Sequence, residues 1–66
     1  MQILVNGKPR EVSDNATVAE LIKALELDPR QVAVEVNLEL APRAEHPTRR
    51  LSSNDRVEVV TLVGGG

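Results

Sequence analysis

The stretch that decides the fold reads Thr17-Val18-Ala19-Glu20-Leu21-Ile22-Lys23-Ala24-Leu25. The spacing i, i+3, i+4 and i+7, which marks one face of a helix, is met by its apolar residues Val18, Leu21, Ile22 and Leu25. Thr17 and Glu20 have the spacing of a capping box, in which each side chain bonds the other residue's backbone amide. Asp28-Pro29 is expected to stop the helix, because the residue before proline avoids the α region. The pattern predicts one amphipathic helix that packs on a sheet.

Two strands are expected before this helix. The apolar run at residues 2–6 ends in Asn6-Gly7, a dipeptide that favours a type I′ hairpin turn because both residues tolerate positive φ. Residues 8–12 then return antiparallel to the first strand. Pro9 has no N–H to donate, so the returning strand is expected at an edge of the sheet.

Three further strands are expected after the helix. Residues 32–36 alternate between valine and other residues, as a half-buried strand does. A short strand at 38–41 is followed by a polar crossing segment at 43–50, which Leu51 pins to the core, and residues 56–63 form the last strand. The element order predicts an α+β fold with one helix on one face of a mixed sheet of four to five strands.

Composition limits the function. The chain has 66 residues, which fits one domain at 1–63 and a flexible glycine tail at 64–66. It has no cysteine and a single histidine, His46, expected in a surface loop, so disulfide, thiol and zinc chemistry are excluded. A net charge of −2 and the absence of aromatic residues argue against nucleic-acid binding. With no basic leader and no apolar run of membrane-spanning length, we expect a cytoplasmic protein without membrane contact.

The sequence ends in Val63-Gly64-Gly65-Gly66, a narrow and pliable tail because glycine lacks a Cβ. A terminal carboxylate is a poor electrophile, but adenylation by ATP converts it to a mixed anhydride that sulfur can attack. If the chain carries sulfur, Gly66 is the expected attachment point, with Gly64 and Gly65 as its tail. The tail by itself does not choose between sulfur carriage and conjugation to another protein. We find no paired carboxylates, nucleophile or phosphate loop, so no catalytic residue is expected and the chain is not predicted to be an enzyme.

A docking surface beside the tail follows from strand alternation. If Ile3 faces the helix, Leu4 faces away, and Val60 and Leu62 face away from the helix in the last strand. We expect a partner that handles the tail to dock on the residues Leu4, Val60, Leu62 and Val63. The alternative is that these are scattered surface aliphatic residues, which are common.

Five segments of the chain together resemble the ThiS family of sulfur carriers. These segments, which cover nearly the whole sequence, are Met1-Gln2-Ile3-Leu4-Val5-Asn6-Gly7, Val32-Ala33-Val34-Glu35-Val36-Asn37, Ala41-Pro42-Arg43, Asp55-Arg56-Val57-Glu58-Val59-Val60 and Val63-Gly64-Gly65-Gly66. The resemblance differs from the family's usual residues at three positions. Leu62 stands where an aromatic is common, Asn54 where glycine is common, and Leu38 where a small or polar residue is common.

The resemblance implies a β-grasp (ubiquitin-like) fold and a thiocarboxylate formed at Gly66, which donates sulfur for the thiazole ring of thiamine. It implies three partners: a ThiF-like adenylating enzyme, thiazole synthase, and a cysteine desulfurase or other persulfide donor. The chain itself is expected to be a monomer with no bound cofactor and no metal, while the adenylating partner uses ATP and Mg. The small subunit of molybdopterin synthase, a ubiquitin-like protein modifier and an inert interaction domain remain as alternatives.

Overall fold

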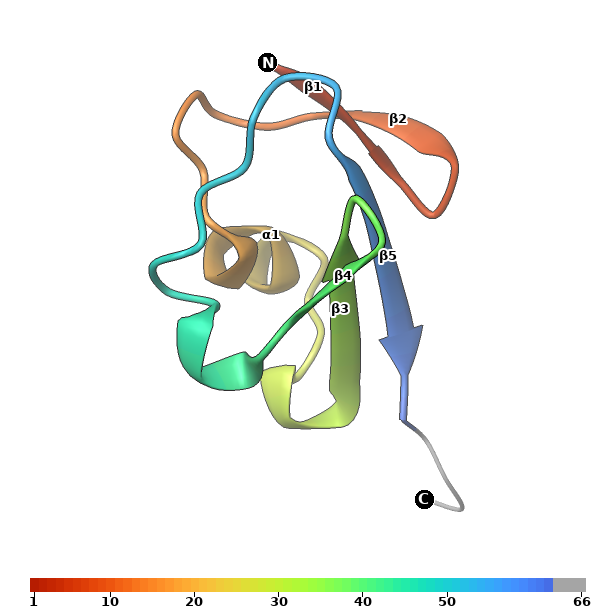
Figure 1. Ribbon diagram of the computed structural model, residues 1–66, viewed down its shortest axis with the longest axis vertical. Coiled ribbons are helices and arrows are strands. Elements are labelled where there is room, and N and C mark those ends of the chain that lie inside the picture. Colours follow the sequence, from red (N-terminus) through yellow and green to blue (C-terminus); the bar gives the residue numbers. More distant parts are fainter. Residues whose placement is uncertain (63–66) are drawn as a thin grey trace.

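Five strands form one mixed sheet, and one α-helix packs on it, in the computed structural model, which describes residues 1–62 (Figure 1). The elements are β1 Gln2–Val5, β2 Lys8–Glu11, α1 Val18–Ala24, β3 Val32–Val36, β4 Glu39–Ala41 and β5 Arg56–Thr61, with two short 3₁₀ helices, η1 Pro29–Gln31 and η2 Arg43–Glu45. This order is the one that the sequence predicts, and the α+β class is confirmed.

The strand order across the sheet is β2-β1-β5-β3-β4. Strands β1 and β5 pair in parallel, and the other neighbours pair antiparallel. The turn between β1 and β2 has positive φ at Asn6 (50°) and Gly7 (82°), as the Asn-Gly dipeptide predicts. Pro9 lies in the edge strand β2, where its missing N–H costs no ladder bond. The first and last strands are therefore central neighbours, and β5 runs away from the end of the molecule that holds the N-terminus (Figure 1).

The predicted capping box opens α1. Thr17 Oγ1 accepts a hydrogen bond from Glu20 N at 3.2 Å, and Glu20 Oε1 accepts one from Thr17 N at 2.8 Å. Glu20 is thus a helix cap, as predicted.

The end of α1 lies earlier than the sequence predicts. The helix ends at Ala24, and Glu26 leaves it in a left-handed conformation with φ 60°. Asp28 does not stop α1 but caps η1, where its Oδ1 accepts a hydrogen bond from Arg30 N at 2.9 Å. The position predicted for the helix stop is therefore wrong, because a left-handed residue ends the helix before the proline is reached.

The core lies between α1 and the face of the sheet that the helix covers. Its buried members are Ile3, Val18, Leu21, Ile22, Val32, Val34, Val36, Ala41, Leu51, Val57 and Val59. Leu25, which lies on the predicted helical face, and Val5, which shares the inward side of β1 with Ile3, are only half-buried against its edge. The reason lies in β2, whose inward positions, opposite Ile3 and Val5, hold the charged residues Arg10 and Lys8. The aliphatic core therefore stops at this edge, where Arg10 Nε is buried without a hydrogen-bond partner in residues 1–62.

His46 is buried, with 3% of its surface exposed, and the prediction of a surface loop residue is wrong. Its Nε2 lies 2.9 Å from the carbonyl oxygen of Ala41 at the end of β4, while its Nδ1 has no partner within residues 1–62. Its backbone oxygen accepts a hydrogen bond from Ala19 N of α1 at 3.0 Å. The crossing segment is therefore held by His46 as well as by the predicted Leu51.

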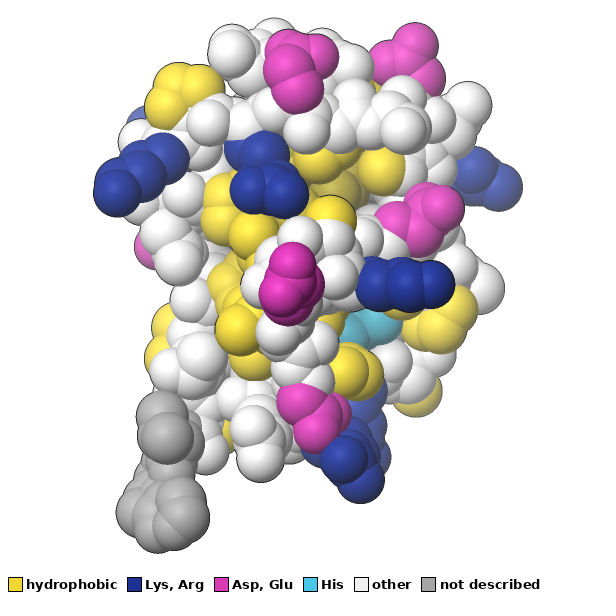
Figure 2. Space-filling view, turned by 180° about the vertical axis from the view of Figure 1, so that it is seen from behind, with side chains coloured by type: hydrophobic (Ala, Val, Ile, Leu, Met, Phe, Trp, Pro, Cys, Tyr) yellow, Lys and Arg dark blue, Asp and Glu magenta, His cyan; other side chains and the backbone are white. Residues whose placement is uncertain are grey.

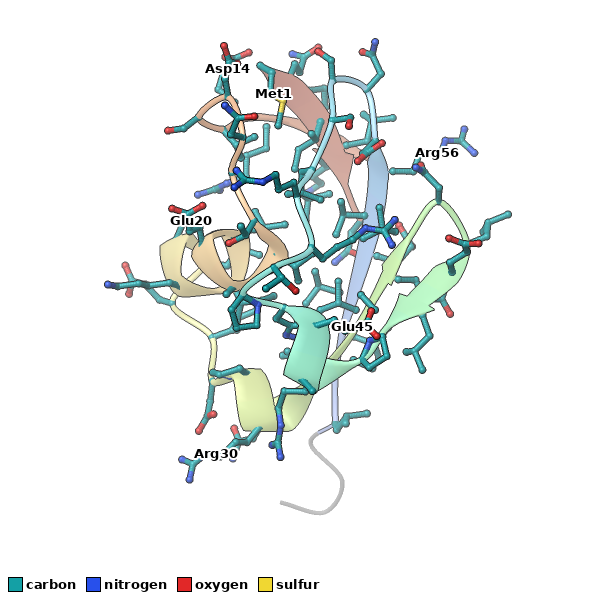
Figure 3. All side chains as sticks on the ribbon, turned by 60° about the vertical axis from the view of Figure 1, so that its left-hand side comes forward. Met1, Asp14, Glu20, Arg30, Glu45 and Arg56 are labelled. Atoms are coloured by element: carbon teal, nitrogen blue, oxygen red, sulfur yellow. The ribbon has the colours of Figure 1, made fainter. Side chains whose placement is uncertain are left out.

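Surface ion pairs are few in residues 1–62. The amino group of Met1 lies 3.2 Å from Asp14 Oδ1 (Figure 3) and 3.7 Å from Glu11 Oε2. The remaining pair joins Arg30 to Asp28 at 2.8 Å.

Candidate functional site

The outer face of the sheet, which is the face that α1 leaves open, is the candidate site. Residues alternate along β5, so Val57 and Val59 are buried while Glu58 and Val60 are exposed. The register carries this face across the sheet, because Glu35 of β3 lies directly between Glu58 and Leu40. The outer face therefore mixes aliphatic and charged side chains, whereas the buried core on the other face is aliphatic.

The predicted docking residues lie at two ends of this face. Val60 is 58% exposed and Leu62 is 57% exposed, as alternation predicts. Leu4 is half-buried, and its neighbour on β5 is Arg56. Glu58 therefore separates Leu4 from Val60, and the docking residues form two apolar areas with a carboxylate between them.

The end of β5 leads to the tail. Leu62 N donates a hydrogen bond to Gln31 O at 2.6 Å, which ties the chain after β5 to η1. Val63 and the glycines Gly64, Gly65 and Gly66 lie outside the described residues. The predicted attachment point and its tail therefore remain predictions.

A groove of about 510 Å³ opens on the outer face, near the start of β5. It is lined by Leu4, Gly7, Glu35, Leu38, Arg56 and Glu58. Leu38, in the turn between β3 and β4, is 84% exposed, and Leu40 of β4 is 65% exposed. Sequence reasoning missed Leu40 as part of this face, although its alternation with the inward-facing Ala41 is a signal for it.

Three polar residues outside the groove have defined places in the structure. Asp55 is a turn former, and its Oδ2 accepts a hydrogen bond from Ser52 N at 2.8 Å. Arg43 is exposed in η2. Hydrogen bonds from the Arg30 side chain and then from its backbone hold the pKa of the Asp28 carboxyl below its ordinary value of 3.8, at about 2. This pair lies at η1, away from the outer-face groove.

Within residues 1–62 no three His, Asp or Glu side chains are grouped so as to hold a metal ion. In the same part of the chain no helix has the length and apolar character needed to cross a membrane.

One helix covers one face of the five-stranded sheet, the other face is open, and the last strand leads to a glycine tail in the sequence. These features define the class: a β-grasp domain of the ubiquitin-like type. The ThiS family model matches residues 3–66. The chain therefore belongs to the ThiS family, whose members are small sulfur carriers of thiamine biosynthesis and not enzymes. Both the resemblance and the fold expected from it are confirmed.

Two relatives of similar length agree with this family. The sulfur carrier protein ThiS of Thermus thermophilus is 36% identical over 64 residues, which are 97% of this chain and 98% of that protein. A crystal structure of the thiamine biosynthesis protein ThiS of Geobacter metallireducens superimposes with a TM-score of 0.85 at 35% identity, over the whole of both chains.

A longer relative places a similar segment in a larger protein. The thiazole synthase of Paramagnetospirillum magneticum is 38% identical over 66 residues, which are the whole of this chain and 20% of that protein. The chain thus spans about a fifth of the length of that relative.

Proposed function

We propose that this chain carries sulfur as a thiocarboxylate on Gly66 and donates it to the thiazole ring in thiamine biosynthesis. The observation that carries the proposal is the family match over residues 3–66, which includes the glycine tail as well as the folded domain. The name of the Thermus relative, a sulfur carrier protein, supports the same role.

The chemistry needs one activation step, one sulfur-transfer step and a reductant. A carboxylate oxygen of Gly66 attacks the α-phosphorus of ATP, pyrophosphate leaves, and an acyl adenylate forms; Mg in the adenylating enzyme balances the phosphate charge. The terminal sulfur of a persulfide then attacks the acyl carbon, and AMP leaves. A thiol cleaves the resulting acyl disulfide, becomes a disulfide itself and releases the thiocarboxylate. A ThiF-like enzyme supplies the first step, and a cysteine desulfurase or other persulfide donor supplies the sulfur.

Thiazole synthase is the proposed acceptor of the sulfur. Two relatives that are named thiazole synthase contain a segment similar to the whole of this chain, at 38% and 35% identity. A segment of the same polypeptide is held close to the rest of that protein at high effective concentration. We infer that a separate chain of this family docks on such a synthase through its outer face.

The folded domain holds the strand that leads to the tail in a fixed position. Strand β5 pairs with β1 and β3, so the last described residue, Leu62, follows a strand fixed on both sides. The four residues from Val63 span about 13 Å when extended, at roughly 3.3 Å each. That length lets Gly66 enter an active site while the domain stays on the outside of the enzyme.

Mass spectrometry of the chain isolated from its own cell tests the proposal. The expected species exceeds the mass of the 66-residue chain by the difference between one sulfur and one oxygen atom, and the same spectrum shows whether Gly66 carries the terminal carboxyl group. Deletion of Gly66 should abolish this species, and Gly65→Val should reduce it, because a β-branched side chain widens and stiffens the tail. A ladder of higher conjugates in place of the sulfur-bearing species would instead indicate a protein modifier.

A further inference from the structure

We propose that the outer-face groove between Leu4 and Leu38 receives a basic side chain, an arginine or a lysine, of the protein that docks on this face. The inference deepens the proposed function and rests on it, since the same face would bind the adenylating enzyme or the synthase. Four observations support it: two facing carboxylates, a cation directed elsewhere, an exposed leucine in a strained conformation, and the shape of the groove.

The first observation is a pair of like charges. Glu35 of β3 and Glu58 of β5 are direct cross-strand partners on the outer face, and both are exposed. Direct partners have Cβ atoms about 5 Å apart, and like charges at that separation repel. Neither glutamate side chain has an ion pair or a hydrogen bond within residues 1–62. The sheet therefore keeps a concentrated negative charge that the described chain does not neutralise.

The second observation concerns Arg56, the cation nearest in sequence to Glu58 on this face. It lines the same groove but lies one outward position earlier on β5, opposite Leu4. Its side chain extends away from the body of the molecule (Figure 3), and no ion pair joins it to Glu35 or Glu58 in the described structure. The two carboxylates therefore remain available to an incoming cation.

The third observation is the conformation of Leu38. The turn between β3 and β4 has positive φ at Asn37 (52°) and at Leu38 (72°). Turns of this kind favour glycine at the second position, because a Cβ there meets the following carbonyl oxygen. Leu38 is thus unfavourable in two respects in the free chain, since it is strained and 84% exposed. Strain of this kind is concentrated at functional positions, and burial of Leu38 by a partner would offset it.

The fourth observation is the shape of the groove and the chemistry of the side chains that line it. Leu4 and Leu38 supply aliphatic contacts in a groove of about 510 Å³, and Glu35 and Glu58 supply the charge. A long basic side chain matches both, because it has an apolar stem and a cationic head. An apolar side chain would leave two carboxylates desolvated and unpaired, and an acidic one would be repelled.

Figure 2 shows the molecule from behind, where hydrophobic side chains gather in the middle and charged side chains lie both over and around them. The other exposed apolar side chains of the outer face, Leu40, Val60 and Leu62, extend the contact surface beyond the groove. A partner that covers them brings its basic side chain to Glu35 and Glu58.

The experiment measures the affinity of the full chain for the ThiF-like enzyme and for the thiazole synthase of its own organism, at two salt concentrations. Glu35→Gln and Glu58→Gln keep the side-chain size and remove the charge. We expect each to weaken binding to at least one partner by about tenfold, with a smaller salt dependence than wild type. Glu39→Gln is the matched control, because Glu39 is exposed but pairs with Val36 and does not line the groove.

Leu38→Gly provides an independent measurement. Glycine relieves the left-handed strain, so the urea midpoint should be unchanged or higher than that of wild type, while binding weakens. Wild-type affinity of both glutamine variants for both partners, or tighter binding, would overturn the inference. Mass spectrometry keeps the two proposals separate: if the thiocarboxylate forms while the glutamine variants bind normally, only the groove assignment fails.

Discussion

The side chain of Asn6 pairs with the backbone of Val59. Its Oδ1 accepts a hydrogen bond from Val59 N at 2.8 Å, and its Nδ2 donates one to Val59 O at 3.1 Å. Strand β1 ends at Val5, and its last backbone bond to β5 runs from Asn6 N to Val57 O at 2.8 Å. The asparagine side chain thus takes the place of the next residue of β1 and holds the middle of β5, the strand that leads to the glycine tail.

We expect Asn6→Gly to destabilise the fold by about 1–3 kcal/mol, because it leaves the Val59 N–H and C=O without partners in a part-buried site. Glycine accepts the positive φ of 50°, so the turn itself is preserved. Asn15→Gly is the matched control, since Asn15 has φ 68° and its side chain makes no hydrogen bond in residues 1–62. Urea unfolding measures both. Equal losses at the two positions would mean that the Asn6 bonds contribute nothing.

The core makes a second prediction through Leu21, which is 1% exposed on the inner face of α1. Leu21→Ala should reduce the free energy of unfolding by roughly 2–5 kcal/mol, because it removes buried methyl groups and leaves a cavity. Lys23→Ala on the exposed side of the same helix should change it by less than about 0.5 kcal/mol. If Leu21→Ala reduces the free energy of unfolding by no more than this control does, Leu21 does not contribute to the core as we expect.

The parts of the fold that the sequence predicts correctly are those with a local signal. The spacing of Leu21 and Ile22 fixes the helical face, and Asn6-Gly7 fixes a turn, because both depend only on nearby residues. The end of α1 has no such signal. Glu26 takes a left-handed conformation that usually favours glycine or asparagine, so the more obvious breaker at Pro29 gave the wrong end.

In the candidate site, too, the features with a local sequence signal were predicted and those set by long-range pairing were not. Strand alternation alone gives the outward direction of Val60 and Leu62. The register between β1 and β5 is set by long-range pairing, so the sequence did not show that Leu4 lies beside Arg56 or that Glu35 faces Glu58. The burial of His46 is likewise non-local. It depends on how the crossing segment meets β4 and α1.

His46 leads to a third prediction. Its ring is buried, and Nε2 lies 2.9 Å from the Ala41 carbonyl oxygen. His46→Ala should cost roughly 2–4 kcal/mol of stability, because it opens a cavity and leaves that carbonyl without its side-chain partner. Glu45→Ala, at an exposed neighbouring side chain, should be nearly neutral. Thermal or urea unfolding measures the stability of the two variants. Similar midpoints would mean that the His46 side chain contributes no more to stability than an exposed side chain does.

Asp28 gives a prediction about pH. Its carboxyl has a pKa of about 2 in the folded chain against an ordinary 3.8, because the Arg30 side chain and backbone donate hydrogen bonds to it. A depressed folded pKa means that the ionised carboxylate stabilises the fold above pH 3.8 and that this stabilisation is lost as the pH falls through about 2. Asp28→Asn should therefore flatten the part of the stability profile between those two values. A carboxyl titration by NMR that places Asp28 at its ordinary pKa would contradict the assignment.

The last prediction tests the docking surface at the end of β5. Val60→Asp places a charge on the outer face, where Val60 is 58% exposed, so the domain should stay folded. Binding to the adenylating enzyme should weaken, because an unpaired carboxylate would enter an apolar contact. Thr61→Asp is the matched control: it is the next residue of the same strand, is exposed, and points toward the other side of the sheet. Isothermal titration of both folded variants gives the comparison. If Val60→Asp binds like wild type, or if Thr61→Asp weakens binding equally, the partner does not dock on this face.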